Sequence, residues 1–379
     1  MKITDVEVLV LPDGDDAMIL VAVDTDDGVY GLGEVGVRTR YRAVLGALEH
    51  LRELVVGEDP ARVEHLWQVM FRRGFFPGDR TVAAAIAAID VALWDIRGKV
   101  FGVPVHALLG GQVRDRVDCY THVETKLDPE ATADSCRALV AEGWRHLRLA
   151  VQDDDGVLDP RAAMRGAIAN FHAARAAVGD EIELAIDVHT RLDPPEAVTL
   201  CREIESARPY FVEDPLRSEG LEGYRMLRLR TGVPLAAGEQ LGSKWEFRRL
   251  IEEDLVDHAR VDVAIAGGLT ESKKIAGWCE THYIQLAPHN PLGPVTTASA
   301  LHLSLATPNV SVQEQHRRQL SPEVAALFTG RPLVRDGYLS PPEGPGLGID
   351  LDRSAARRLH AVAVERPHLR RPDGAFTNW

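Results

Sequence analysis

The stretch ELAIDVH, residues 183–189, joins an apolar run to an aspartate and a histidine. Its apolar part, residues 184–186, is typical of a strand that is buried on both faces. Asp187 and His189 are two residues apart, so on an extended strand they point to the same side. A buried strand that delivers a carboxylate and an imidazole to one point predicts a functional site at its end.

Short apolar runs of the same kind recur through the middle of the chain, and a helical pattern follows each of them. The eight predicted strands are DCYTHV (118–123), HLRLAV (146–151), ELAIDVH (183–189), PYFVEDP (209–215), PLAAGE (234–239), HARVDVAI (258–265), YIQLAPH (283–289) and VSVQEQ (310–315). The predicted helices between them include residues 130–142, 161–177, 194–206, 243–254 and 269–281. Strands that alternate with helices indicate a parallel sheet. Eight such units within roughly 200 residues predict a closed (β/α)8-type barrel.

The regions that flank the barrel differ from it in pattern. Residues 1–35 contain two apolar runs around DTDDG, which predicts a hairpin, and residues 41–110 are rich in helix formers. We therefore predict an α/β protein with three parts. They are an N-terminal α+β capping domain (1–112), a barrel catalytic domain (113–318) and a C-terminal segment (319–379) that packs back on the capping domain. A length of 379 residues fits a large domain plus a smaller one.

Composition and charge narrow the class of protein. The formal net charge is −14 and the acids are dispersed apart from the run at 153–155, which argues against nucleic acid or an anionic membrane as a partner. No apolar run reaches the length of a membrane span, and the start lacks a signal-peptide pattern. The four cysteines have no CxxC spacing, so we expect a reduced, cytoplasmic protein without structural zinc. We also expect a symmetric homo-oligomer.

Three acids stand at the ends of successive predicted strands. Asp187, Glu213 and Glu239 are separated by 26 residues and again by 26 residues, which is one βα unit each time. Carboxylates that face one point repel each other, and a divalent cation offsets the repulsion. Oxygen ligands favour a hard ion such as Mg²⁺. A single acid in such a place could equally cap a helix or pair with an arginine, but the repeated spacing favours a metal site.

Two histidines flank this predicted metal site. His289 ends the seventh strand, and Asp262 on the preceding strand could bond its far nitrogen and raise its basicity. His189 lies across the mouth. A divalent ion that holds a carboxylate acidifies the adjacent C–H and stabilises the enediolate, so a base and an acid here would catalyse racemisation or dehydration. The alternative for either histidine is a hydrogen-bonded structural residue.

Several segments together resemble the enolase superfamily, in its mandelate racemase-like branch. They are AAIAAIDVALWDIRGKVFGVPVHALLGG (84–111), FVEDP, PLAAGEQ, VDVAIAGGLTESKKIA and LAPHNPLGPVTTASALHL. The resemblance covers nearly the whole chain. Within the branch, DVHTRL, APHNPLGP, VQEQ and YTHVE are similar to segments of sugar-acid dehydratases that act on galactonate, mannonate or gluconate.

The resemblance implies a Mg²⁺-dependent hydro-lyase that converts an aldonate into a 2-keto-3-deoxy acid. It implies the three acids as Mg²⁺ ligands, and a dyad of His289 and Asp262 as the base that removes the C2 proton. His189 would protonate the departing 3-hydroxyl. Glu314, on the eighth strand, would hydrogen-bond the substrate carboxylate as its charge grows.

One position departs from the racemases of this superfamily. Many of them carry Lys-x-Lys on the second barrel strand, whereas this chain has Arg148 at the matching position. Arginine stays protonated and is a poor base, so dehydration is favoured over two-base racemisation. Arg148 is expected to bind substrate or stabilise charge, and the segment after it lacks the tyrosine expected of mannonate dehydratases. A racemase or epimerase of a hydroxy acid, and a non-catalytic family member with a regulatory role, are the alternatives.

Two basic loops of the capping domain are expected to meet the far end of the substrate. They are EVGVRTRYR (34–42) and FRRGFFPGDR (71–80), and their arginines would bind an anionic group, so an aldarate is another candidate substrate. A solvated surface is the alternative explanation. The candidate substrate contacts are Arg38, Arg40 and Arg73 in these loops, His122 at the end of the first strand, and His316 after the eighth.

Overall fold

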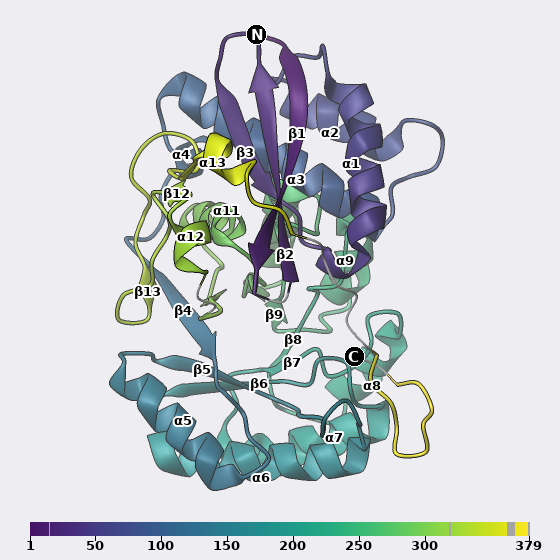
Figure 1. The fold of residues 1–379 in the computed structure, drawn as a ribbon. Coiled ribbons are helices and arrows are strands. Elements are labelled where there is room, and N and C mark those ends of the chain that lie inside the picture. Colours follow the sequence, from purple (N-terminus) through teal and green to yellow (C-terminus); the bar gives the residue numbers. More distant parts are fainter. Residues whose placement is uncertain (15, 318–319, 362–367, 378–379) are drawn as a thin grey trace.

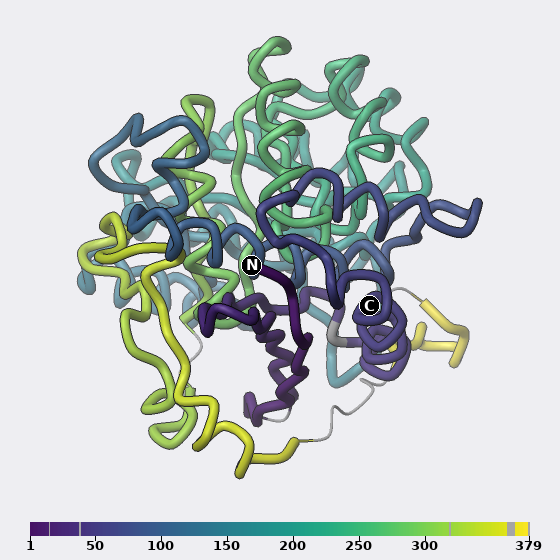
Figure 2. The backbone as a smooth tube through the Cα atoms, turned by 90° about the horizontal axis from the view of Figure 1, so that it is seen from above, coloured from purple at the N-terminus to yellow at the C-terminus, as the bar shows by residue number. Residues whose placement is uncertain are grey.

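The computed structural model describes residues 1–14, 16–317, 320–361 and 368–377. A three-stranded sheet with its helices sits on a ring of parallel strands that is surrounded by helices (Figure 1). Seen from above, the C-terminal segment, coloured yellow-green to yellow, runs along the outside of the molecule (Figure 2). The predicted fold class, an α/β barrel with an α+β capping domain, is confirmed.

The capping domain holds an antiparallel sheet and the first helices. Its strands are β1 (Ile3–Asp13), β2 (Asp16–Thr25) and β3 (Tyr30–Glu34), in the order β1-β2-β3. Its helical elements are η1 (Arg38–Arg40), α1 (Tyr41–Val55), α2 (Val63–Arg72), α3 (Arg80–Phe101) and α4 (Val105–Leu108). The predicted hairpin is the turn between β2 and β3, where Gly28 has a φ of 79° that suits glycine.

The barrel contains all eight predicted strands, and each is shorter than or equal to its sequence pattern. They are β4 (Val117–His122), β5 (His146–Ala150), β6 (Glu183–Asp187), β7 (Val212–Glu213), β8 (Leu235–Ala237), β9 (His258–Ala259), β10 (Gln285–Leu286) and β11 (Gln313–Glu314). The elements between them are α5 (Pro129–Ala141), α6 (Pro160–Val178), α7 (Pro194–Ile204), η2 (Glu205–Ala207), α8 (Leu221–Arg228), α9 (Lys244–Glu252), α10 (Gly268–Thr281) and α11 (Pro294–Leu305). The C-terminal segment adds α12 (Pro322–Ala325), β12 (Phe328–Thr329), β13 (Tyr338–Leu339), β14 (Asp350–Leu351) and α13 (Arg353–Ala356).

The eighth strand closes the ring. β11 pairs in parallel with β4 on one side. On its other side, Leu286 in β10 donates its amide to the carbonyl of Asn309 at 2.7 Å and accepts from the amide of Ser311 at 2.9 Å. The carboxyl ends of all eight strands therefore meet at one mouth, where barrel enzymes place their chemistry.

Buried acids of the capping domain hold the first turns of two barrel helices. Glu34, at the end of β3, accepts from the amides of Gly293 at 2.7 Å and Thr296 at 3.0 Å, where α11 begins. Asp90 in α3 accepts from the amide of Thr270 at 3.0 Å in the first turn of α10. An acid at a helix N-terminus satisfies free amides and interacts favourably with the helix dipole. These contacts fix the capping domain at the mouth of the barrel.

The C-terminal segment contacts both parts of the molecule. Arg353 pairs with Asp24 at 2.6 Å and with Glu7, both in the capping sheet, whereas β13 pairs with β4 of the barrel. Near the end of the chain, the amide of Arg370 donates to the carbonyl of Gly156 at 2.9 Å. The segment therefore lies on the barrel as well as on the capping domain to which we expected it to return.

The four cysteines are unpaired and buried. Within the described parts of the chain, no helix combines the length and the apolar character that a bilayer crossing requires.

A buried histidine pair should make stability depend on pH. The Nδ1 of His302 in α11 accepts from the amide of His106 at 3.0 Å, and burial lowers the pKa of His302 to about 3. The unfolded chain takes up this proton near pH 6.5 while the native state does not, so stability falls as pH drops below 6.5. We expect this group to remove about 2 kcal/mol between pH 7 and pH 5. Urea unfolding at both pH values, with His302→Asn and the exposed His50→Asn as comparison, measures it, and an equal pH dependence in all three proteins would contradict it.

Candidate active site

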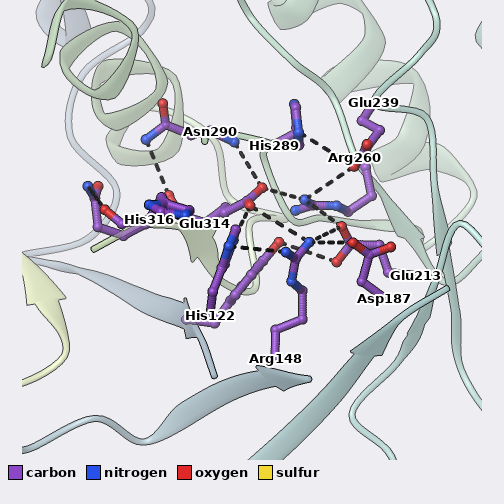
Figure 3. Close-up of polar contacts among 12 residues, drawn as sticks. His122, Arg148, Asp187, Glu213, Glu239, Arg260, His289, Asn290, Glu314 and His316 are labelled. Carbon is purple, nitrogen blue, oxygen red and sulfur yellow. Dashed lines mark hydrogen bonds and ion pairs between the residues drawn. The ribbon is translucent and has the colours of Figure 1, made fainter. Parts of the chain in front are cut away.

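Side-chain alternation along the barrel strands builds the site. One interior layer is mostly apolar and consists of Tyr120, Ala185, Phe211, Ala236, Ala287 and Val312. Residues two positions further along a strand point to the same side and lie nearer the mouth. Five side chains at this level follow a member of the apolar layer by two residues, and they are His122, Asp187, Glu213, His289 and Glu314. Arg148 and Arg260, which follow His146 and His258 by two residues, lie among them (Figure 3). A layer of ionisable side chains therefore covers an apolar layer.

Three buried acids lie close enough together to hold a cation. Glu213, Asp214 and Glu239 each offer a carboxylate oxygen, and these oxygens lie within 4.8 Å of one another. Asp214 Oδ2 and Glu239 Oε2 are buried without a hydrogen-bond partner among the described residues. Burial raises the pKa of Glu213, and the charges of Arg260 and Arg148 oppose the rise. Carboxylate oxygens with free lone pairs suit a hard divalent ion.

Asp187 stands at the edge of this group. Its Oδ2 accepts from Arg148 Nη1 at 2.9 Å, and the same nitrogen donates to Glu213 Oε1 at 3.0 Å. Asp187 and Glu239 both line a cavity of about 600 Å³ at the mouth of the barrel. Asp214, in contrast, lines a separate cavity of about 10 Å³. The structure thus brings two predicted ligands into the close group and sets the third beside it, on the side of the larger cavity.

His289 and Asp262 lie together as a hydrogen-bonded pair. His289 Nδ1 is 2.6 Å from Asp262 Oδ2, and Asp262 Oδ1 accepts the amide of Ala264 at 2.7 Å. The other ring nitrogen, Nε2, lies 3.6 Å from Glu239 Oε2. Burial disfavours the charged imidazole, but the charges of Glu239 and Glu314 and the bond to Asp262 outweigh it and raise the pKa of His289 to about 9. His289 is a basic imidazole with one nitrogen held in place.

A turn, rather than the strand, carries His189. β6 ends at Asp187, and His189 and Thr190 have positive φ angles of 52° and 59°. The amide of His189 donates to Asp187 Oδ1 at 2.6 Å, and its Nε2 lies 4.0 Å from Glu239 Oε1. Left-handed backbone is costly for residues other than glycine and is concentrated at functional sites. The imidazoles of His189 and His289 therefore flank the two oxygens of Glu239.

Arg148, His122 and Glu314 form a chain of hydrogen bonds in the wall of the cavity. Arg148 Nη2 lies 3.1 Å from His122 Nδ1, and His122 Nε2 lies 2.5 Å from Glu314 Oε1. Since arginine only donates, His122 accepts at Nδ1 and donates from Nε2. Burial and the charge of Arg148 lower the pKa of His122 to about 3, so this imidazole is neutral.

Arg260 belongs to the same layer and is absent from the predicted site. Its fully buried guanidinium donates to Glu213 Oε1 at 3.0 Å and to Glu314 Oε2 at 2.5 Å. A signal was available in HARVDVAI (258–265), where an arginine stands two residues before Asp262 in an otherwise apolar strand. Alternation alone places those two residues on the same side.

The capping domain forms the far wall of the cavity. Its lining residues there include Asp16, Thr39, Arg40, Arg80 and Thr81, and His122 and His316 of the barrel line the cavity as well. Arg40 is exposed and has no hydrogen bond or ion pair in the described parts of the chain, whereas Arg80 pairs with Glu246 at 2.9 Å. The side chain of Arg38 lies outside the described residues, and Arg73 is exposed on the loop before α3.

Two family models match most of the chain. Residues 10–110 match the N-terminal domain of the mandelate racemase / muconate lactonizing enzyme family, and residues 131–355 match the model described as enolase C-terminal domain-like. The chain belongs to the enolase superfamily. The resemblance inferred from the sequence motifs is thereby confirmed.

This enolase-superfamily member has full-length relatives. It is 38% identical to a D-galactonate dehydratase of Ralstonia nicotianae and 38% identical to one of Ralstonia pickettii, with 100% of both chains covered in each case. An enolase of Pantoea ananatis with bound D-gluconate and Mg is 30% identical, with a TM-score of 0.93 over 100% of this chain and 99% of that one. An enolase of Agrobacterium radiobacter with bound Na and L-malate is 32% identical, with a TM-score of 0.92 over 100% of both chains. The predicted enzyme class, a hydro-lyase, is confirmed by the full-length dehydratases.

Proposed function

We propose that this protein is a Mg²⁺-dependent dehydratase of a sugar acid, with an aldonate of the galactonate type as substrate. The observation that carries the proposal is the pair of imidazoles, His289 and His189, which lie 3.6 Å and 4.0 Å from the two oxygens of Glu239 in one cavity. A cavity that offers a base and an acid beside carboxylates fits an elimination of water. The names of the full-length relatives support the substrate class.

Asp187, Glu213 and Glu239 are the ligands that we propose for Mg²⁺. Asp187 and Glu239 would hold the ion at the larger cavity, which they line, and Glu213 would hold it from the close group of carboxylate oxygens. Asp214 lines the separate small cavity instead. The buried oxygen of Glu239 that lacks a hydrogen-bond partner among the described residues fits this role. When bound, Mg²⁺ supplies positive charge that stabilises the negative charge developing on the substrate carboxylate.

The protein side chains move the protons. Asp262 holds Nδ1 of His289, so Nε2 removes the C2 proton of the substrate. His189 protonates the 3-hydroxyl, the C3–O bond breaks and water leaves. The resulting enol becomes the 2-keto-3-deoxy acid by proton return to C3. The second base that a racemase needs is missing at position 148, since an arginine held by Asp187, Glu213 and His122 stays protonated there.

A substrate panel tests this function directly. The purified protein is incubated with Mg²⁺ and with galactonate, gluconate, mannonate or galactarate, and the keto acid is trapped with semicarbazide. We expect a keto acid from an aldonate, and we expect EDTA to abolish it. Deuterium exchange at C2 without any keto acid would contradict the proposal and favour a racemase.

Arg40 should discriminate between substrates at their far end. It is the cavity-lining cation without an ion pair among the described residues, so it favours a substrate that ends in a second carboxylate. We expect Arg40→Gln to lower kcat/KM for galactarate by roughly fivefold, the size of an exposed ion pair, and to change galactonate turnover by less than about twofold. Arg73→Gln is the matched control, because Arg73 is exposed on the loop before α3 and is not among the residues that line the cavity. An equal loss of kcat/KM for both substrates would show that Arg40 does not recognise the second carboxylate of galactarate.

A further inference from the structure

Arg260 makes several buried contacts with charged side chains, although it has no role in the proposed proton transfers. Its Nη2 donates to Glu213 Oε1 at 3.0 Å and to Glu314 Oε2 at 2.5 Å, and it lies 3.7 Å from Glu239 Oε2. Its Nη1 donates to the carbonyl of Ala287 at 2.8 Å, in the strand that leads to His289. The side chain is fully buried, so water does not screen these contacts. Figure 3 shows it in the midst of the acids.

The acids around it would repel each other without a cation. Glu213 Oε1 accepts from both Arg148 Nη1 and Arg260 Nη2, each at 3.0 Å. The two arginines therefore compensate the negative charge of the carboxylates in this layer. A divalent ion that binds Glu213 and Glu239 must share these carboxylates with Arg260, and two cations near one carboxylate repel each other.

We propose that Arg260 is a positioning residue that holds Glu213 and Glu314 in place and weakens the binding of Mg²⁺ to the acids. This inference rests on the proposed metal site. Arg260 does not touch the cavity lined by His189 and His289, so it acts through the acids that it holds. An uncharged residue in place of Arg260 leaves the negative charge of the acids less compensated. A bound metal ion would then provide the positive charge that the arginine provided, and would bind more tightly.

The test separates this role from an ordinary stabilising contact. We expect Arg260→Gln to melt at a lower temperature than the wild type in EDTA and to gain more in Tm on addition of Mg²⁺. We expect its Kd for Mg²⁺, measured by calorimetry, to be lower than that of the wild type by about tenfold. Its kcat should fall by at least about tenfold, because Glu314 loses a donor. Tighter metal binding with slower turnover is a combination that a simple loss of folding does not produce.

Matched variants keep the inference open to refutation. Arg353→Gln removes another arginine that pairs with two acids, Glu7 and Asp24, far from the barrel mouth. It should lower Tm but leave the gain from Mg²⁺ unchanged. Arg260→Lys keeps the charge without the planar fork, so its Kd for Mg²⁺ should stay within about twofold while kcat falls.

An unchanged or raised Kd for Mg²⁺ in Arg260→Gln would overturn the inference. If Arg260→Gln does not fold, a wild-type kcat in Arg260→Lys would overturn it instead. The Tm and Kd measurements need no substrate. A protein without activity on any sugar acid would therefore refute the proposed function and leave the role of Arg260 to be judged on metal binding.

Discussion

The His289→Asn variant should keep less than about one thousandth of the wild-type rate of keto-acid formation, which is within the range of a general base. Asparagine has no nitrogen that can take the C2 proton, and the residue that orients the ring, Asp262, cannot replace it at 2.6 Å behind the imidazole. The rate is measured with the aldonate that the substrate panel identifies.

The surface of the protein offers a matched control for this variant. His282 pairs with Asp254 at 2.9 Å in an exposed position on the barrel. His282→Asn therefore removes a histidine–aspartate pair without touching the cavity and should keep full activity. Turnover of His289→Asn within tenfold of the wild type would exclude His289 as the base and direct attention to His189.

The second large effect should separate Asp187 from Asp214. We expect Asp187→Asn to weaken Mg²⁺ binding by more than roughly 100-fold and to abolish turnover, since a proposed ligand loses its charge. Asp214→Asn should weaken binding less, by roughly 10- to 100-fold at most, which is the size of an effect from outside the ligand set. Asp214 is buried, with its pKa raised by burial and by the charge of Glu239. Calorimetry with Mg²⁺ and the keto-acid assay measure both variants.

The structure also defines what the reverse result would mean. Glu213, Asp214 and Glu239 form the group with oxygens within 4.8 Å of one another. If Asp214→Asn loses the metal and Asp187→Asn retains it, the ligand set is this group, and Asp187 serves to hold Arg148 and the amide of His189. Glu213→Gln should lose the metal under either assignment.

Several features of the site follow from spacing and alternation in the sequence. The recurrence of strand-like runs predicted all eight barrel strands, because a parallel barrel needs buried strands at regular intervals. The positions of Asp187, Glu213, His289 and Glu314 at strand ends follow from the same pattern. That these side chains converge could be predicted without the structure, since the strands of a closed barrel end at one mouth.

Other features depend on contacts between segments that are distant in the sequence. His189 reaches the site through a left-handed turn with a φ of 52°, which no strand pattern predicts. Whether Arg148 faces a substrate or the protein depends on where the side chains of Glu213 and His122 lie, and the structure shows contacts of 3.0 Å and 3.1 Å with them. Asp16 and Arg80 enter the cavity wall from the capping domain, whose placement depends on buried acids at helix N-termini.

The sequence by itself therefore determined the barrel, the acids and histidines at its mouth, and the family, because these depend on periodicity and on residue types at fixed positions along each strand. Only the tertiary structure decided which of these charges compensate each other. It identified Arg260 as the buried cation between Glu213 and Glu314. It also showed that Asp214 is an alternative to Asp187 as the third metal ligand. Which charged side chains pair depends on distances of a few ångströms between residues on different strands. The periodicity along one strand carries no information about those distances.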